Sequence, residues 1–210
     1  MASDTISVVA AARPHPHETI SGDLWTVQWA ADGACRVAVV DGLGHGPAAH
    51  AAARAAVQTL DAAPELPPDR ALALCQRSLV GTRGAAIGIV RLDLAAQRLT
   101  FAGIGNVEGR LWRPDREQRL LAQRGIVGAA MPTIRPVDLA LGPDWLLILH
   151  SDGISDRYAS AALPGWGGPT QPLADTILER YGRPTDDATV VIATPSRVTP
   201  TGGPDSGQAS

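Results

Sequence analysis

The stretch VAVVDGLGHGP, residues 37–47, decides the fold, because it changes from a strand into a helix within a few residues. An unbroken, valine-rich apolar run precedes Asp41 and predicts a strand buried on both faces. Glycines and Pro47 follow, and proline is tolerated in the first turn of a helix, where its missing N–H is not needed. The alanine-rich run that comes next predicts a helix over residues 46–60. The sequence therefore places an acid at the end of a buried strand, directly before a glycine turn.

Other acids occupy similar positions at the ends of predicted strands. They lie in the motifs SGD, HSDG and TDDAT and are Asp23, Asp152, Asp186 and Asp187. If these strands are neighbours, the acids converge on one edge of a sheet. Carboxylates about 4 Å apart repel each other by roughly 4 kcal/mol at an effective dielectric constant of about 20, so such a cluster needs cations. The motifs offer oxygen ligands and no cysteine, which favours Mg²⁺ or Mn²⁺ over zinc.

Apolar and β-branched runs separated by Gly, Pro and Asp predict a chain rich in strands. Strands are expected at residues 4–10, 24–30, 35–41, 85–93, 98–105, 107–112, 136–141, 144–152 and 187–193. Apolar residues at helical spacing predict further helices at 69–80 and 171–181. This order of elements predicts an α+β domain, in which stacked antiparallel sheets are covered by helices.

The composition is that of one globular domain. The chain has 210 residues, of which 45% are hydrophobic, and residues 1–194 are expected to form a single domain around one core. Residues 195–210 are rich in Gly, Pro, Ser and Thr and lack an apolar pattern, which predicts a disordered tail. Cys35 and Cys75 lie far apart and are expected to be buried free thiols.

Charge and hydropathy argue against several classes of partner. The formal net charge is −3 and the pI is about 5.9, so no basic field exists to attract nucleic acid or an anionic membrane. No run approaches the roughly 18 to 20 apolar residues that span a bilayer, and the first residues lack the features of a secretory signal. A cytoplasmic location is therefore expected, and we expect a monomer.

The motifs SGD, VVDGLGHG, HSDGISD and DDATVVIA, in this order, resemble those of the metal-dependent type 2C protein phosphatases (PP2C), in the branch named for SpoIIE. The resemblance covers about residues 4–194. The short chain, the lack of a sensor domain and the segment GIGNV at 103–107 are most similar to the stand-alone stressosome phosphatases of the RsbX type. Such enzymes remove phosphate from serine or threonine, here on STAS-domain proteins of a stressosome or anti-sigma pathway. The implied fold is a central antiparallel β-sandwich flanked by helices in four layers.

The resemblance also implies two Mn²⁺ or Mg²⁺ ions at one edge of the sandwich. Asp41 would then contact both ions, and Gly42 would add its backbone carbonyl, which no side chain shields. Asp23 would hold one ion, while Asp152 and Asp186 would hold the other. Asp187 is a candidate for a residue that supports these ligands rather than the ions.

His45 is the candidate for the acid that protonates the leaving alcohol. Many type 2C phosphatases carry a histidine directly after the Asp-Gly pair, whereas this one comes four residues after Asp41, as in the SpoIIE branch. Glu18 is either a solvated loop acid or a residue linked to the metal site, and the neighbouring histidines His15 and His17 are expected to be loop residues. Arg13 is a possible phosphate ligand.

Two other functions fit parts of the sequence. A Rossmann domain would explain the strand, glycine turn and helix at 37–60, but Pro47 replaces the third glycine and Asp41 would repel a pyrophosphate. A phosphatase fold that has lost catalysis and acts as a binding module in the same pathway is the second alternative. Loss of metal-binding acids would be tolerated there, yet every expected acid is present.

Overall fold

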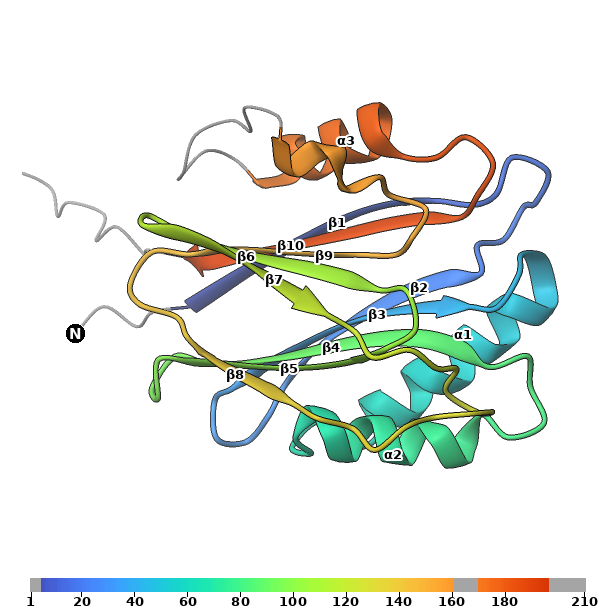
Figure 1. Ribbon diagram of the computed structural model, residues 1–210, viewed down its shortest axis with the longest axis horizontal. Helices are drawn as coiled ribbons and strands as arrows, with labels where there is room; N and C mark the ends of the chain where they lie inside the picture. The colour runs from blue at the N-terminus through green and yellow to red at the C-terminus, as the bar shows by residue number, and fades with distance from the viewer. Residues whose placement is uncertain (1–4, 161–169, 197–210) are drawn as a thin grey trace, which may run out of the picture.

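Two five-stranded antiparallel sheets stack face to face in the computed structural model, which describes residues 5–160 and 170–196 (Figure 1). The first sheet has the order β1-β10-β9-β6-β7, with the bounds β1 Thr5–Arg13, β10 Ala188–Ser196, β9 Leu146–His150, β6 Glu108–Arg113 and β7 Arg116–Leu121. The second has the order β2-β3-β4-β5-β8, with the bounds β2 Asp23–Trp29, β3 Cys35–Gly42, β4 Ala85–Asp93, β5 Arg98–Ile104 and β8 Val137–Ala140.

Helices cover the outer faces of both sheets, as Figure 1 shows. They are α1 Gly46–Asp61 and α2 Pro68–Ser78 on the second sheet, and α3 Thr170–Tyr181 with the short 3₁₀ helix η1 Asp156–Ser160 on the first. The layers therefore run helix, sheet, sheet, helix. This arrangement confirms the predicted α+β sandwich and excludes a Rossmann domain, because the strands of both sheets pair antiparallel.

Strand β3 shows how this layering follows from the sequence. Val37 and Val39 point into the apolar core between the sheets, while Ala38 and Val40 pack in the second core, beneath α1 and α2. A strand buried on both faces has no reason to alternate polar and apolar residues, which explains its continuous apolar run. The side of α1 that faces the sheet is largely alanine, so helix and sheet can approach closely.

The predicted elements are confirmed with small shifts, but one strand was missed. β7 reads REQRLL, and most of it is exposed at the edge of its sheet, so it carries no alternating apolar signal. β10 runs on to Ser196, which pairs with Thr5, past the predicted domain end at residue 194. Residues 197–210, which make up most of the predicted disordered tail, lie outside the described residues. Cys35 and Cys75 are buried free thiols, as predicted.

Antiparallel pairing brings distant motifs to one end of the sandwich. β3 ends where β2 begins, so Asp41 lies opposite Asp23 in the register. In the other sheet β9 ends near the start of β10, where His150 lies opposite Val190. The loops that carry the remaining acids therefore leave the first sheet at the same end of the molecule.

Candidate metal centre

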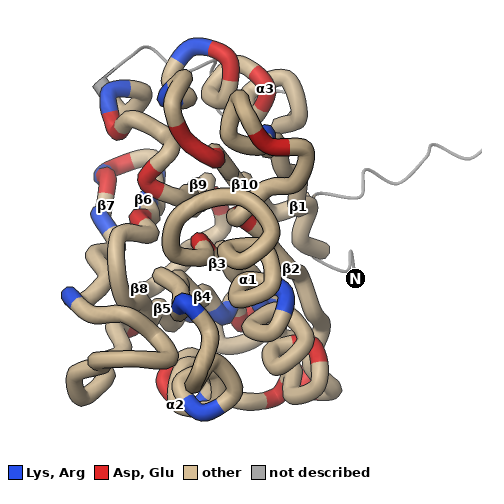
Figure 2. Tube along the Cα trace, turned by 90° about the vertical axis from the view of Figure 1, so that its right-hand side faces the viewer, with Lys and Arg blue, Asp and Glu red and all other residues tan. Residues whose placement is uncertain are grey.

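The predicted acids meet at the end of the sandwich where β3 approaches β9 and β10. In Figure 2, which faces this end, acidic segments gather between the two sheets. Asp41 lies close enough to the other acids of the cluster to be repelled by all of them, namely Asp23, Asp152, Asp186 and Asp187. The structure thus brings together acids that lie up to 164 positions apart in the sequence, from Asp23 to Asp187, as the strand-end pattern predicted.

Ser151 ties the two sheets together beneath this cluster. Its side chain is fully buried, and its Oγ donates a hydrogen bond of 2.5 Å to Asp23 Oδ2. The same Oγ accepts a hydrogen bond from the Thr189 N–H at 3.1 Å, while the Ser151 N–H donates to the Thr189 carbonyl at 3.0 Å. Asp23 of one sheet is therefore fixed to the ends of β9 and β10 of the other. Sequence reasoning did not single out Ser151, although it lies inside the HSDG motif.

Burial and mutual repulsion make the carboxylates hold protons more tightly than free aspartate. Burial first, then the nearby Asp23 and the other acids, raise the pKa of Asp41 to about 9. Burial also raises the pKa of Asp23 to about 7, although the hydrogen bond from Ser151 opposes this. The pKa of Asp186 is raised as well, by burial and then by Asp152. A cluster with these properties is stabilised by positive charge.

The donor set fits hard divalent cations. All five side chains offer only carboxylate oxygens, the ligands that Mg²⁺ and Mn²⁺ prefer. Asp187 is 3% exposed, and its Oδ2 is buried without a hydrogen-bond partner in the described part of the chain. Within residues 5–160 and 170–196, no three His, Cys, Asp or Glu side chains already form a group that could hold a metal ion. Binding therefore requires the carboxylates to move closer together.

Glycine is required at position 42 by the packing of α1. A Cβ atom on Gly42 would overlap the backbone carbonyl of Ala49 and lie 3.1 Å from the Gly22 carbonyl oxygen. The Gly42 N–H donates to that same Gly22 oxygen at 3.1 Å. The sequence argument attributed this glycine to an unshielded carbonyl that could reach a metal. In the structure, glycine is needed here because α1 packs closely against β3. That the Gly42 carbonyl binds a metal ion remains a prediction.

The loop with the sequence PHPHE, residues 14–18, packs against His45. His45 Nδ1 lies 2.7 Å from Glu18 Oε1, and the ring of His15 stacks on the His45 ring with centroids 4.4 Å apart. The His15 N–H also donates to Asp187 Oδ1 at 2.8 Å. His15 was expected to be an ordinary loop residue, but it links His45 to the acid cluster.

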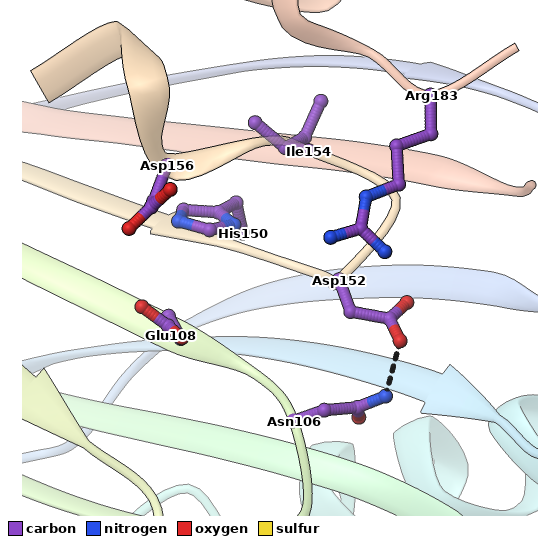
Figure 3. A pocket seen from close by; sticks show the side chains of 7 residues that line it. All are labelled: Asn106, Glu108, His150, Asp152, Ile154, Asp156 and Arg183. Carbon is purple, nitrogen blue, oxygen red and sulfur yellow. Dashed lines mark hydrogen bonds between the residues drawn. The ribbon is translucent and has the colours of Figure 1, made fainter.

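A pocket of about 240 Å³ opens beside the cluster and shares Asp152 with it (Figure 3). Asn106 forms the boundary, because its Nδ2 donates to Asp152 Oδ2 at 2.5 Å. Arg183 lies on the same side of the pocket, with its guanidinium directed towards Asp152 in Figure 3. Arg13, which the sequence analysis considered only as a possible phosphate ligand, donates through Nη2 to the Arg183 carbonyl at 2.6 Å. Arg13 thus braces the turn that carries Arg183.

Two antiparallel sheets between helices, with aspartates converging where the sheets meet, form the fold of the PP2C-type protein phosphatases, which are hydrolases. The match to known families is more specific. The family model of Stage II sporulation protein E (SpoIIE) matches residues 31–195, and the chain belongs to this family. Among curated protein sequences, none matches the chain.

Solved structures with the same fold include stressosome and sporulation proteins. One of them comes from work on the bacterial stressosome, described there as a modular system that has been adapted to control secondary messenger signalling. It is 29% identical to this chain, with a TM-score of 0.82, and the match covers 90% of this chain and 99% of the other. RsbX in complex with magnesium is 19% identical, with a TM-score of 0.78 over 93% and 100%. The PP2C domain of SpoIIE from Bacillus subtilis is 22% identical, with a TM-score of 0.78 over 95% and 66%. At these identities, RsbX and the SpoIIE domain show that the fold is shared and nothing further.

None of the helices in the described segments is both long enough and apolar enough to cross a membrane.

Replacing Asp41 by asparagine, which has no proton to release on unfolding, is expected to stabilise the metal-free protein at neutral and basic pH. The folded protein keeps the Asp41 proton up to about pH 9, whereas the unfolded chain releases it near the ordinary aspartate pKa, so the folded state binds more protons between these values. Its free energy of unfolding therefore falls as the pH rises through this window. In EDTA at pH 8, Asp41→Asn should be more stable than wild type by on the order of 1–3 kcal/mol.

Urea unfolding at pH 5 and pH 8 measures this difference. Asp115→Asn, in the exposed turn between β6 and β7, makes the same charge change away from the cluster and should have little effect. A variant at Asp41 that is less stable than wild type at pH 8, or a difference that does not grow with pH, would contradict the convergence of these acids.

Proposed function

We propose that this PP2C-type phosphatase hydrolyses phosphoserine or phosphothreonine on STAS-domain proteins of a stress-signalling pathway, using two Mn²⁺ or Mg²⁺ ions. The observation that carries the proposal is the convergence of the three other aspartate-bearing segments on Asp41. The likeness to a stressosome chain, and the fold shared with RsbX, support the pathway and the substrate class. The cytoplasmic location and the monomeric state remain predictions from the sequence.

The aspartates would hold the two ions in the arrangement that the motifs suggest. Asp41 would contact both ions, Asp23 and the Gly42 carbonyl would contribute on one side, and Asp152 and Asp186 on the other. Asp187, which accepts a hydrogen bond from the His15 N–H, would hold this arrangement in place. Bound ions would neutralise the phosphate and supply an activated water for its hydrolysis.

His45 would give a proton to the leaving serine oxygen. Its Nδ1 is engaged by Glu18 Oε1, and its ring is fixed by stacking on His15, so Nε2 is the atom that remains for the substrate. Glu18 would orient the ring, as a carboxylate does for a general acid in other active sites. The proton would pass from Nε2 to the alkoxide as the bond between phosphorus and the serine oxygen breaks.

The alternative is a binding module that has kept the fold and lost the reaction. Each predicted ligand is present, and Ser151 fixes Asp23 in the cluster through a buried hydrogen bond. A protein that only binds its partner has no need of buried acids with raised pKa values, which cost stability. The arrangement of the acids therefore favours the enzyme.

Hydrolysis of p-nitrophenyl phosphate and of a phosphorylated STAS-domain protein tests the proposal. We expect no turnover in EDTA, restoration by Mn²⁺ or Mg²⁺, and a higher kcat/KM on the STAS-domain protein than on an unrelated phosphoprotein. Turnover that persists in EDTA would overturn the metal-dependent mechanism. Protein that binds the STAS domain but never turns over would identify the binding module, and equal rates on both phosphoproteins would remove the proposed substrate class.

A further inference from the structure

The pocket beside the metal centre has an end that the proposed reaction does not use. This inner end lies beyond Asp152, and His150, Glu108 and Asp156 line it (Figure 3). In that view the His150 ring lies beside the Asp156 carboxylate and above the Glu108 carboxylate, while Arg183 lies on the opposite side, towards Asp152. The end furthest from the centre therefore consists mainly of hydrogen-bond acceptors.

His150 supplies a buried acceptor without a partner. It is 2% exposed, and its Nδ1 lies 2.8 Å from the Ser151 carbonyl oxygen. Because a carbonyl oxygen can only accept, Nδ1 carries the proton, and in a neutral ring Nε2 then presents a lone pair. Nε2 is buried and has no hydrogen-bond partner among the described residues. A buried acceptor facing a pocket is satisfied by a ligand that donates a hydrogen bond.

The flanking carboxylates strengthen this preference for a donor. Arg119 Nη2 contacts one oxygen of Glu108 at 2.7 Å and approaches Asp156 at 3.9 Å, so the arginine holds these two acids near each other. Arg110 lies 3.7 Å from Asp156 and keeps its own closer contact with Glu117. With Asp152 included, three carboxylates and His150 line the pocket together with Arg183, while Arg119 and Arg110, which do not line it, approach Glu108 and Asp156.

Size and geometry select among cationic ligands. At about 240 Å³ the pocket is smaller than the roughly 300–1,000 Å³ that is usual for small-molecule sites, and it suits a single long side chain. Asp152 forms a wall of both the pocket and the centre, so this side chain would come from a residue near the phosphorylated serine. The ammonium of Lys and the guanidinium of Arg supply several N–H donors and a positive charge.

We propose that this pocket is a substrate-recognition subsite, which binds a Lys or Arg side chain of the phosphoprotein close to the phosphorylated residue. The inference rests on the proposed phosphatase function and adds sequence specificity to it. His150 Nε2, Glu108 and Asp156 accept the hydrogen bonds of the bound cation.

Phosphoserine peptides test the subsite. A peptide with alanine at all flanking positions is compared with peptides in which one lysine is moved through those positions, and kcat/KM is measured with Mn²⁺. For wild type, lysine at one position should raise kcat/KM about tenfold over alanine. Asp156→Asn and Glu108→Gln should each reduce this ratio to about twofold. Because the ratio compares two peptides on one enzyme, any general loss of activity cancels. Glu117→Gln, a nearby acid outside the pocket, should keep the wild-type ratio.

The outcomes separate this proposal from the function on which it rests. Metal-dependent hydrolysis of all peptides without a preference for lysine overturns the subsite and leaves the phosphatase intact. A lysine preference that survives both pocket variants, or that Glu117→Gln also removes, places the recognition elsewhere and overturns it too. Absence of turnover on every peptide and on p-nitrophenyl phosphate overturns the proposed function, and the subsite with it.

Discussion

Asp41→Asn is expected to reduce kcat for phosphoserine hydrolysis at least about 10³-fold at saturating Mn²⁺, which corresponds to roughly 4 kcal/mol of transition-state stabilisation. Asp41 is the side chain on which the other acids converge, and it would contact both ions. Asparagine keeps the shape but removes the charge that binds them. Single-turnover and steady-state rates measure the loss, and Asp115→Asn, in an exposed turn, should retain wild-type turnover.

The stability measurement described above provides the control for folding. A variant that is folded, more stable without metal and inactive with metal is the combination that the carboxylate cluster predicts. Turnover within tenfold of wild type at saturating Mn²⁺ would remove the two-ion mechanism.

Gly42→Ala is expected to lower the free energy of unfolding by more than about 3 kcal/mol, because an added methyl group would overlap the Ala49 carbonyl and force α1 away from β3. The shift would also move Asp41, which precedes Gly42 in the strand, so activity should fall with stability. Gly153→Ala should behave similarly, since its Cβ would overlap the Asp187 carbonyl and separate two acid-bearing loops.

Urea unfolding measures the loss, and Gly33→Ala serves as the control. Gly33 has a φ of 84° and no atom within 4 Å of an added Cβ, so alanine there should cost only about 1–2 kcal/mol through backbone strain. A Gly42 variant no less stable than the Gly33 variant would show that the helix and strand are not packed as described.

The fold could be predicted where burial leaves a pattern in the sequence. The continuous apolar run of β3 and the alanine face of α1 both follow from burial, and both elements were predicted. β7 was missed because its residues are mostly exposed, and only its pairing with β6 makes it a strand. An edge strand of this kind is defined by its hydrogen bonds to the neighbouring strand, and these bonds leave no periodic pattern in its own residues.

Those residues of the site that lie at the ends of predicted strands could be found from the sequence. The aspartates were found because each one lies at the end of a strand. Ser151 and His15 act through contacts with Asp23 and Asp187, far away in the sequence, and no local pattern reports such a contact. The packing requirement for glycine at position 42 could not be predicted from the sequence either, because it depends on how closely α1 approaches β3.

Anomalous scattering from crystals grown with MnCl₂ tests the central claim most directly, because it locates manganese independently of activity. We predict two manganese peaks at the end of the sandwich, both in contact with the Asp41 carboxylate, one also with Asp23 and the other with Asp152 and Asp186. Crystals of Asp41→Asn grown in the same way should lose at least one peak. Crystals of the wild-type protein that show no manganese at Asp41, or show it only at another surface, would contradict the account.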